Sequence, residues 1–396
     1  MSKIERTITR AVAAALVLGV GGCETPTTAA TPDPLAVSED AAVGGDPWLP
    51  LATWNVYLGG DIAPVLAADF SDPVSVVTAS AQAWAQVQNS NMPERAAEVV
   101  RRLAAEMPAV VGLQEVFQFV ELDGTFQPIA PPLDMLGLLQ SEIAAQGVPY
   151  QVAAVQEGTS AALPVSIDLS TFQVDRWVAF TDRVATLVRD DVDVDGVHQG
   201  PYQASLELAP GFELRRGWIR TDISHKGGIV HVINTHLEGQ ALAPVQSAQV
   251  DELLGAITAG LTGTVVLMGD LNSDAAAGPG APSWTPTYSR LVDAGFFDLW
   301  NEARPRAGDG FTCCHDPGLG NPVPELDERI DFVLVRQPAA SAGGGKMEGK
   351  VRADIMGDDP DERTTPSGIW PSDHAGIAVD LLLPPGLGST GEGNGS

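Results

Sequence analysis

The sequence has few cysteines, few basic residues and no long hydrophobic run. Its three cysteines, Cys23, Cys313 and Cys314, are too few for a fold held together by disulfides. No apolar run reaches the roughly 20 residues that a permanent membrane-spanning helix needs. Lys and Arg number 22 against 51 Asp and Glu, so the formal charge is −29. This balance argues against a basic protein that coats nucleic acid, although an enzyme can still hold a polyanion through metal ions.

The rest of the composition is that of a globular protein. Hydrophobic residues make up 44% of the chain, which is too many for a disordered acidic segment. A chain of 396 residues can bury a large core. Residues 48–384 contain no internal repeat and no stretch of linker composition. We therefore predict one folded domain over residues 48–384.

The N-terminal segment has the layout of an export signal. Three basic residues within positions 1–10 precede the apolar stretch AVAAALVLGV (11–20), which is followed by two glycines and Cys23. A basic start, a short apolar middle and small residues at the cleavage site are typical of a signal peptide. The sequence VGGC resembles a bacterial lipobox, which implies a lipid on Cys23 and a chain anchored to a membrane outside the cytoplasm. The alternative is an ordinary signal peptide with an incidental cysteine.

The segments on both sides of the domain have compositions that do not form a packed core. Residues 24–47 are rich in Thr, Ala and Pro, and the chain ends in GLGSTGEGNGS. We predict a lipoprotein-type signal peptide (1–22), a flexible Thr/Ala/Pro-rich tether (23–47), the folded domain (48–384) and a disordered Gly/Ser tail (385–396).

Short apolar runs predict buried strands, and many of them follow one another without a helix between them. The runs cover residues 51–56, 109–116, 184–188, 228–237, 264–272, 330–335 and 376–383. One helix is expected to start at Asn91, with Pro93 in its first turn and Glu94 completing a capping box, and a second to cover about 246–259. This mixture predicts a layered α/β sandwich. Residues 120–176 hold no strong motif and are expected to elaborate one end of the sheet.

Polar side chains end or follow most of these strands. A single one would be explained as a cap or a turn former, but six strand ends carry carboxylate, amide or imidazole groups. Such groups are expensive to bury unless they bind a metal or each other. Oxygen ligands suit Mg²⁺, and two histidines suit proton transfer. The residues are Asn55, Glu115, Asn234, His236, Asp270, Asn272, Asp331, Asp373 and His374.

Six motifs around these residues carry a family resemblance. They are TWN (53–55), LQEV (113–116), NTHLEG (234–239), GDLNSD (269–274), RIDFVLV (329–335) and SDHAGI (372–377). In this order they resemble the endonuclease/exonuclease/phosphatase superfamily of metal-dependent phosphoesterases. The resemblance implies a four-layered α/β sandwich, in which two mixed, mainly antiparallel β-sheets pack together between helices. It also implies an active site at one mouth of the sandwich.

The resemblance assigns three residues to a metal site. Asn55 and Glu115 correspond to the family's metal-site pair, with Glu115 as the main Mg²⁺ ligand. Asp373 corresponds to a further acidic residue linked to the metal. The implied cofactor is Mg²⁺, with Mn²⁺ as the alternative, because a divalent ion must neutralise charge where an anionic nucleophile approaches phosphorus.

Five further residues correspond to catalytic positions of the superfamily. His236 resembles the histidine that contacts the scissile phosphate. Asp270 and Asn272 resemble the pair that orients the attacking water and the phosphate. Asp331 resembles the carboxylate that orients His374, and His374 resembles the base or phosphate-stabilising imidazole. An imidazole paired with a carboxylate has its tautomer fixed and its charged form stabilised.

The implied activity is extracellular, Mg²⁺-dependent hydrolysis of a phosphodiester or phosphomonoester by in-line attack of water. The substrate is left open among phospholipids, nucleotides and nucleic acid, and the negative charge disfavours nucleic acid. A DNA or RNA endonuclease of the same superfamily and a catalytically inactive surface-binding lipoprotein are the alternatives. We expect a monomer whose membrane contact is the lipid anchor.

Two further motifs could suggest other ligands. DVDVDG (191–196) matches part of a calcium loop, but Tyr202 stands where the loop needs a bidentate Glu, so a hairpin turn at Asp195-Gly196 is favoured. GGKMEGKV (344–351) lacks the Ser or Thr of a phosphate loop and is interpreted as a glycine-rich surface loop.

Single residues outside the motifs receive structural interpretations. Arg215-Arg216 could bind a phosphate, but a solvated strand end is favoured. The adjacent cysteines are expected to form either a vicinal disulfide or two buried thiols. Phe117 and Phe119 could contact a membrane, but a core position is favoured for both.

Overall fold

The computed structural model describes residues 48–168, 170–171, 173–303, 308–338, 347, 349–364 and 366–383. The predicted signal peptide, the tether with Cys23 and the C-terminal tail lie outside the described residues, as does part of the glycine-rich segment 344–351. The predictions for these segments therefore remain predictions.

An eight-stranded mixed sheet places the first and last described strands side by side. Its order is β15-β16-β1-β2-β6-β3-β4, and β5 pairs with β6 outside this path. β1 is parallel to β2 and antiparallel to β16. The strands are β1 (Trp48–Asn55), β2 (Val110–Gln114), β3 (Gln118–Asp123), β4 (Leu133–Asp134), β5 (Tyr150–Asp168), β6 (Gln173–Arg189), β15 (Lys350–Met356) and β16 (Gly376–Leu382).

A second mixed sheet has six strands in the order β13-β14-β12-β11-β10-β7. Only the β11–β12 pairing among its described pairs is parallel. The strands are β7 (Val194–Pro201), β10 (Gly217–His225), β11 (Gly228–His236), β12 (Thr264–Asp270), β13 (Phe297–Asp298) and β14 (Asp331–Arg336). A separate hairpin joins β8 (Leu206–Ala209) to β9 (Phe212–Leu214).

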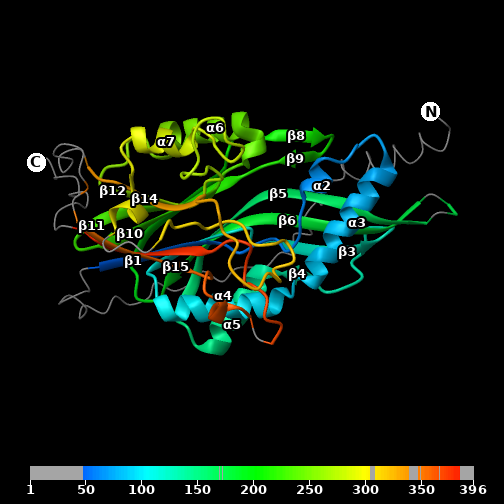
Figure 1. The fold of residues 1–396 in the computed structure, drawn as a ribbon, viewed down its shortest axis with the longest axis horizontal. Coiled ribbons are helices and arrows are strands. Elements are labelled where there is room, and N and C mark those ends of the chain that lie inside the picture. Colours follow the sequence, from blue (N-terminus) through cyan, green and yellow to red (C-terminus); the bar gives the residue numbers. More distant parts are fainter. Residues whose placement is uncertain are drawn as a thin grey trace, which may run out of the picture.

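Helices cover the outer face of each sheet, which gives the four layers seen in Figure 1. α4 and α5 lie against the larger sheet, and α6 and α7 against the smaller one. The predicted four-layered α/β sandwich is thereby confirmed. The helices are α2 (Ala63–Leu66), α3 (Pro73–Asn89), α4 (Met92–Glu106), α5 (Met135–Gln146), α6 (Ala243–Glu252), α7 (Thr287–Asp293) and α8 (Leu299–Glu302), with a π-helical turn at Leu253–Ile257 and 3₁₀ turns at Gln240–Leu242 and Pro360–Glu362.

The two sheets are held together by buried aliphatic side chains. Leu51 and Val110 of the larger sheet belong to the same buried cluster as Val232, Val266 and Val333 of the smaller one. Burying such a side chain contributes about 1.5–3 kcal/mol relative to leaving it exposed. This contact fixes how the ends of the two sheets face each other, and the polar residues of the motifs stand at those ends.

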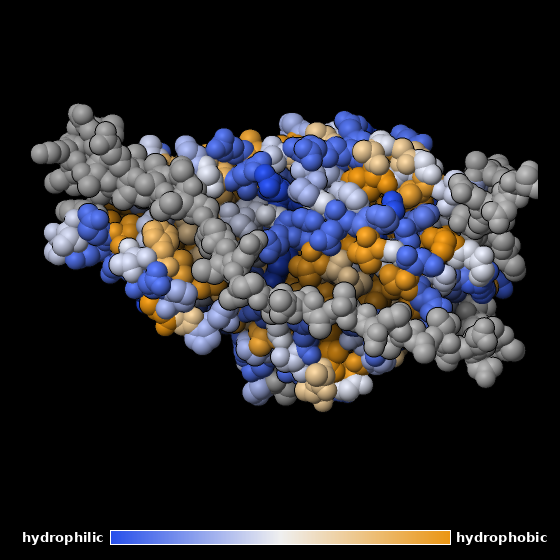
Figure 2. Space-filling view, turned by 180° about the vertical axis from the view of Figure 1, so that it is seen from behind, coloured by the Kyte–Doolittle hydropathy of each residue, from blue (hydrophilic) through white to orange (hydrophobic). Residues whose placement is uncertain are grey.

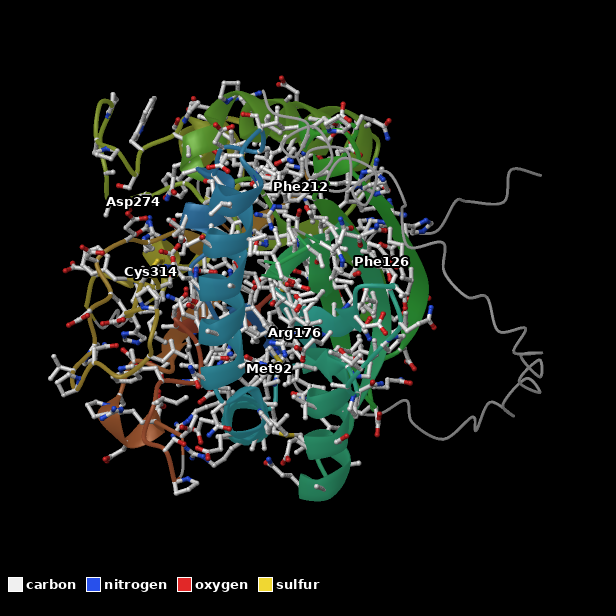
Figure 3. All side chains as sticks on the ribbon, turned by 90° about the vertical axis from the view of Figure 1, so that its right-hand side faces the viewer. Met92, Phe126, Arg176, Phe212, Asp274 and Cys314 are labelled. Atoms are coloured by element: carbon white, nitrogen blue, oxygen red, sulfur yellow. A yellow bond between two sulfur atoms is a disulfide. The ribbon has the colours of Figure 1, made fainter. Side chains whose placement is uncertain are left out.

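Residues 120–176 form a large part of one end of the sandwich. They supply most of β3, all of β4, α5 and β5, and the beginning of β6. Figure 3 looks onto this end of the molecule, where α3 runs in front of the sheets. The Asp72 side chain accepts a hydrogen bond from Val74 N, and Pro73 occupies the first turn, so the start of α3 is well defined. The expected elaboration therefore exists, and it is built from long strands.

Three local predictions differ from the structure. Asn91 adopts a left-handed conformation without a side-chain cap, and Glu94 instead accepts a hydrogen bond from Ser367 N, so the predicted capping box is wrong. The expected helix over 246–259 begins earlier and ends as a π-helical turn. The turn before β7 lies at residues 190–191, and Asp195-Gly196 belongs to the strand.

The calcium-loop match at residues 191–196 does not form a shared ligand set. Asp191 is ion-paired with Arg189, and Asp195 accepts a hydrogen bond from the Ser224 hydroxyl on the neighbouring strand. Asp191 therefore belongs to the exposed turn before β7, and Asp195 is a surface residue of β7.

The molecular surface mixes hydrophilic side chains with separate hydrophobic groups, as the face in Figure 2 shows. Among the described helices, none has both the length and the apolar character required to cross a bilayer.

Candidate active site

Three site residues lie in one row across neighbouring strand ends. His236 ends β11 and pairs in register with Asp270 at the end of β12, and Asp270 pairs with Asp331 at the start of β14. His236 Nε2 is 3.4 Å from Asp270 Oδ2. Gly269 permits this register, because a Cβ atom there would lie 1.8 Å from the Thr235 carbonyl oxygen. The strand register therefore assembles residues that are far apart in the sequence.

Asn55 reaches this row from the opposite sheet. Its Nδ2 donates a 3.0 Å hydrogen bond to Asp270 Oδ2, while its Oδ1 accepts one from Tyr57 N. A second bridge between the sheets lies beneath it, where Gln114 Nε2 donates to Asn234 Oδ1 at 2.7 Å. Asn234, which the sequence grouped with the other strand-end residues, thus connects the two sheets.

His374 approaches the row from the loop before β16. Its Nδ1 is 2.9 Å from Asp331 Oδ2, and both side chains are buried. Trp54 Nε1 donates to the His374 carbonyl oxygen at 2.9 Å, and Ser372 Oγ accepts from His374 N at 3.2 Å. The ring and the backbone of His374 are therefore both held in place.

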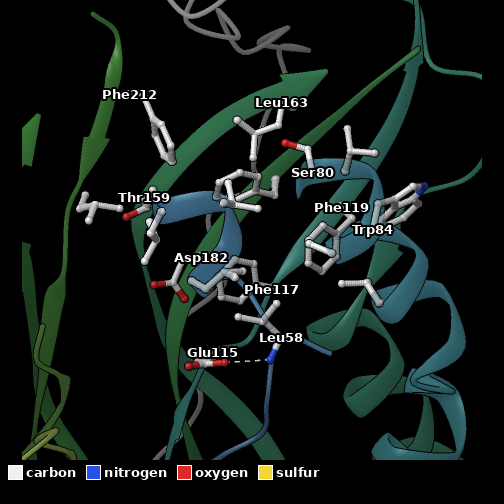
Figure 4. A pocket seen from close by; sticks show the side chains of 18 of the residues that line it. Leu58, Ser80, Trp84, Glu115, Phe117, Phe119, Thr159, Leu163, Asp182 and Phe212 are labelled. Carbon is white, nitrogen blue, oxygen red and sulfur yellow. Dashed lines mark hydrogen bonds between the residues drawn. The ribbon is translucent and has the colours of Figure 1, made fainter. Parts of the chain in front are cut away.

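Glu115, directly after β2, and Asn272, two residues after β12, share an unusual backbone conformation. Their φ angles are 55° and 48°, in the left-handed region that residues other than glycine rarely occupy. Leu58 N donates a 2.8 Å hydrogen bond to Glu115 Oε2, which Figure 4 shows as a dashed line. Asn272 N donates to Asp270 Oδ1 at 2.9 Å, and its side-chain Nδ2 is 3.2 Å from His236 Nε2. Strained residues of this kind cluster at functional sites.

Two carboxyl groups of the site are destabilised in their charged form. Burial, with a smaller contribution from neighbouring Asp331, raises the pKa of the Asp270 carboxyl to about 7. Burial likewise raises the pKa of the Asp373 carboxyl to about 7, and the charge of Glu115 acts in the same direction. A bound cation would relieve the repulsion between these buried carboxylates.

The two histidines differ in their electrostatic environments. Burial lowers the pKa of His236 well below its ordinary range, and Arg216 and His374 act in the same direction. Although burial opposes its charge, Asp331 and Asp373 raise the pKa of His374 well above its ordinary range. The surroundings therefore favour a neutral imidazole at His236 and an imidazolium at His374.

The donor set fits a divalent cation that prefers oxygen. Asp331 Oδ1 is buried and has no hydrogen-bond partner. One ligand atom each from Asp270, Asp331 and His374 lies within 4.8 Å of the others. Glu115 and Asp373 add two carboxylates at the same end of the sheets. Carboxylate oxygens are the ligands of Mg²⁺ in proteins, so the residues present suit the ion that the sequence predicts.

The structure corrects the interpretation of Arg216 as part of a solvated strand end. Its guanidinium is 2.9 Å from Asp182 Oδ2 and 3.2 Å from Glu238 Oε1, and all three side chains are largely buried. Its Nη1 is also 3.0 Å from His236 Nδ1. On the other side of the ring, Asn272 Nδ2 is 3.2 Å from His236 Nε2. Arg216 therefore helps to hold the ring of a predicted catalytic residue in place.

Replacing Arg216 by Ala should strongly destabilise the fold, because Asp182 and Glu238 would remain buried without a counter-charge. We expect a loss of about 3–5 kcal/mol in the free energy of unfolding, measured by urea denaturation. Arg215 is the matched control, since its partner is the partly exposed Glu213. Arg215→Ala should stay within about 0.5 kcal/mol of the wild type. Equal stability of the two variants would contradict the buried-cluster interpretation.

Arg95 is a second site-supporting residue that the sequence did not indicate. It lies on α4 with no exposed surface, and its guanidinium donates to the carbonyl oxygens of Tyr57 and Pro371. These contacts join the loop after Asn55 to the loop that carries Asp373. Burial lowers the pKa of the Arg95 guanidinium to about 10, while Asp373 acts in the opposite direction. Arg95 thus supplies a positive charge behind the acidic site.

Cys313 and Cys314 form a disulfide between adjacent residues, the first of the two states that the sequence left open. Cys313 pairs with His374 in an isolated β-bridge. Their sulfur atoms lie within 4.8 Å of a His374 ring nitrogen. Bonded to each other, the sulfurs are not thiolate ligands, so the pair forms part of the wall beside His374.

The structure brings the eight predicted catalytic and metal-binding residues to one end of the two sheets. His236, Asp270, Asn272, Asp331 and His374 are linked by short contacts, and so is Asn55. Glu115 and Asp373 are coupled electrostatically beside them. The individual roles remain predictions. His231, outside this group, is held by Asp222 and the Thr262 carbonyl oxygen in a structural role.

Several solved structures are similar to this chain. An endonuclease/exonuclease/phosphatase family protein from Leptotrichia buccalis C-1013-b is 15% identical, with a TM-score of 0.49, over 85% of this chain and 100% of its own. An endonuclease/exonuclease/phosphatase from Beutenbergia cavernae DSM 12333 is 22% identical, with a TM-score of 0.49, over 85% of this chain and 72% of its own. TDP2 of D. rerio, solved with a single-strand DNA product, is 16% identical, with a TM-score of 0.49, over 85% and 100%.

A search of curated proteins finds no match. The family model described as endonuclease/exonuclease/phosphatase matches residues 52–374, which is most of the chain. This span runs from β1 to His374 and includes every predicted catalytic and metal-binding residue. The chain therefore belongs to the endonuclease/exonuclease/phosphatase family and is a metal-dependent phosphoric ester hydrolase.

Proposed function

We propose that the chain is an extracytoplasmic, Mg²⁺-dependent phosphoesterase that a lipid on Cys23 tethers to a membrane. The observation that carries the catalytic part is the row His236–Asp270–Asp331, with His374 beside it and Asn55 opposite. The location is supported by the signal-peptide layout and the VGGC sequence. The intact mass of the mature chain tests the anchor, because an unmodified Cys23 would contradict it.

Glu115 and Asp373 would hold the metal, with the unpartnered Asp331 Oδ1 as a further oxygen donor. When bound, Mg²⁺ would neutralise charge on the phosphoryl oxygens and polarise the phosphorus centre. The remaining catalytic tasks fall to side chains whose positions are fixed by their neighbours.

Asp270 is placed to orient the attacking water and to accept its proton. Asn55 Nδ2 and Asn272 N each donate to one of its carboxylate oxygens, so the carboxylate has a fixed orientation. Asn272 Nδ2 and His236 Nε2 lie 3.2 Å apart on the adjoining side, where both side chains are placed to contact a phosphoryl oxygen. His374, with its Nδ1 on Asp331, directs Nε2 toward the same space and stabilises negative charge there.

The site also argues against a binding protein that has lost its activity. Such a protein would be free to lose the buried carboxylates, which are expensive to keep without a catalytic use. Here Asp270 and Asp331 have less than 2% exposed surface, and each expected partner is in place.

A substrate panel tests the proposal directly. Purified protein is assayed on bis-p-nitrophenyl phosphate, p-nitrophenyl phosphate, duplex DNA, sphingomyelin and inositol phosphates, with Mg²⁺ and with EDTA. We expect hydrolysis of at least one phosphoester that requires Mg²⁺ and is lost in EDTA, because the acidic site depends on a counter-ion. Mn²⁺ should restore part of the activity. Turnover that is unaffected by EDTA would overturn the mechanism.

A further inference from the structure

A narrow apolar pocket opens directly beside Glu115. It is enclosed by α2, α3, β5, β6 and β9, and its cavity volume is about 100 Å³. Pockets for small molecules are mostly apolar, as this one is. Figure 4 shows side chains from these elements converging on the pocket, with Leu163 and Phe212 on one side and Phe117 and Phe119 on the other.

Aromatic and aliphatic side chains form nearly all of the wall. Phe117 lies 5.5 Å from Phe119 and 6.0 Å from Phe180, measured between ring centroids, and Phe180 lies 6.4 Å from Phe212. Phe117 and Phe119 are buried, as the sequence favoured, but they face this pocket. Most of the wall comes from α3 and from strands β5 and β6, which residues 120–176 form wholly or in part.

The polar end of the pocket is shared with the active site. Glu115, Asp182 and Arg216 line this end, and Leu58, which lines it too, donates its N–H to Glu115. Arg216 connects the pocket to His236 through its 3.0 Å hydrogen bond. A molecule whose phosphoryl group lies at the active site could therefore extend an apolar part directly into the pocket.

Two buried polar atoms in the lining have no hydrogen-bond partner. They are Ser80 Oγ and Asp182 Oδ1, on residues that are 3% and 4% exposed. In Figure 4 the Asp182 carboxylate lies next to Glu115, and the Ser80 hydroxyl lies higher on the opposite wall. Unpartnered buried groups of this kind are expensive unless a ligand or water completes them. Ile62 and Leu66 also line the pocket and are 37% and 38% exposed, so apolar surface reaches the solvent there.

The lining is poorly suited to a nucleobase. A base needs several partners for the polar atoms along its edge, but the Thr159 hydroxyl is already bonded to the backbone of Arg215, and the unpartnered Ser80 Oγ and Asp182 Oδ1 lie on different walls. The single cation of the lining, Arg216, is paired with Asp182 and Glu238 and offers no free charge to a nucleic-acid backbone. An aliphatic chain has no such requirements and gains from contact with the apolar side chains that form most of the wall.

We infer that this pocket is a substrate subsite for an aliphatic chain, so that the enzyme acts on phosphoesters of amphiphilic, lipid-like molecules. The inference rests on the proposed phosphoesterase function and adds the substrate class. The phosphoryl group occupies the site at Glu115, and the chain extends between α3 and the β5–β6 hairpin toward Ser80.

A series of 4-nitrophenyl alkyl phosphates with chains from methyl to dodecyl, assayed as monomers with Mg²⁺, tests this inference. In each hydrolysis a water oxygen bonds to phosphorus and the bond to the nitrophenyl oxygen breaks, which yields nitrophenol and an alkyl phosphate. We expect kcat/KM to rise about threefold per methylene. The hexyl ester, which has five more methylenes, should therefore exceed the methyl ester by roughly 240-fold. The 4-nitrophenyl ester of thymidine phosphate serves as the nucleotide comparison.

A pocket-filling variant locates the effect. Leu163→Trp should lower kcat/KM for the decyl ester by at least roughly 30-fold and change the methyl ester less than about twofold. Val292→Trp, which likewise replaces an aliphatic side chain by Trp but at an exposed position of α7, is the control and should leave both unchanged. If Leu163→Trp does not fold, Leu163→Ala replaces it, and the longest accepted chain should then become longer.

The outcomes separate this inference from the proposed function. A flat chain-length profile with normal methyl-ester turnover, or preference for the thymidine ester, overturns the aliphatic subsite and leaves the phosphoesterase function intact. Absence of Mg²⁺-dependent turnover of every ester overturns the function. In that case calorimetry on the metal-free protein decides the subsite: tighter binding of decylphosphonate than of methylphosphonate supports it, and equal binding overturns it.

Discussion

Glu115→Ala is expected to lower kcat/KM on a phosphodiester by at least ~100-fold, because it removes a carboxylate from the acidic metal site. Glu115 is held in a left-handed conformation directly after β2, and Leu58 N donates to its Oε2. The backbone of the loop after β1 thus fixes the carboxylate at the mouth that the two sheets form.

Glu115→Gln separates the charge of this side chain from its shape. The amide keeps an oxygen that can accept from Leu58 N, so the loop should stay in place, but it binds Mg²⁺ more weakly. We expect a similar fall in kcat/KM, together with a higher Mg²⁺ concentration at half-maximal activity. Glu157→Gln, at an exposed position of β5, is the control and should behave as the wild type. Near-wild-type turnover of Glu115→Gln at low Mg²⁺ would refute the metal-ligand role.

The sequence predicted the site because its polar residues interrupt buried strands at their ends. Asn55, His236 and Asp270 each close an apolar run, and strand pairing brings such ends to one edge of a sheet. The order of the motifs was also visible in the sequence. The sequence alone did not reveal the strand register that sets His236 opposite Asp270 and Asp270 opposite Asp331. Register depends on the packing of whole strands.

The supporting charges were missed because their partners are distant in the sequence. Arg216 stands 34 residues from Asp182 and 22 from Glu238, and an arginine pair near a strand end is usually solvated. Arg95 occupies a buried face of α4, where the sequence shows only an ordinary charged helix residue. A buried charge is recognisable only once the surrounding elements are packed around it.

The apolar pocket was invisible for a different reason. Residues such as Leu163, Phe180 and Phe212 have the hydrophobicity of core residues, and most of them are buried. Whether such residues fill a core or line a cavity depends on how α3 and the β5–β6 hairpin are held apart. That separation is a property of the packed elements, and no local pattern in residues 120–176 encodes it.

His374→Ala is expected to lower kcat by roughly 1,000-fold, within the range for loss of a positioned acid–base or charge-stabilising group. The ring is buried, and its Nδ1 is bonded to Asp331 Oδ2, so Nε2 is the atom free to act on the phosphoryl group. His198→Ala is the matched control, because the His198 side chain is 53% exposed and stands on β7. Single-turnover assays at saturating Mg²⁺ measure the chemical step, and circular dichroism verifies folding. Turnover within about tenfold of the wild type would contradict the assigned role.

The hydrogen bond between His374 and Asp331 allows this prediction to be tested with a double variant. If Asp331 acts by orienting the imidazole, Asp331→Asn should lower kcat in the wild type but add little to the loss in His374→Ala, since residues that work as one unit are not additive. If the unpartnered Asp331 Oδ1 also binds the metal, the double variant should instead need more Mg²⁺ than His374→Ala alone. The Mg²⁺ dependence of the four proteins therefore separates the orienting role of Asp331 from a ligand role. A full multiplicative loss in kcat at saturating Mg²⁺ would show that the two residues act independently.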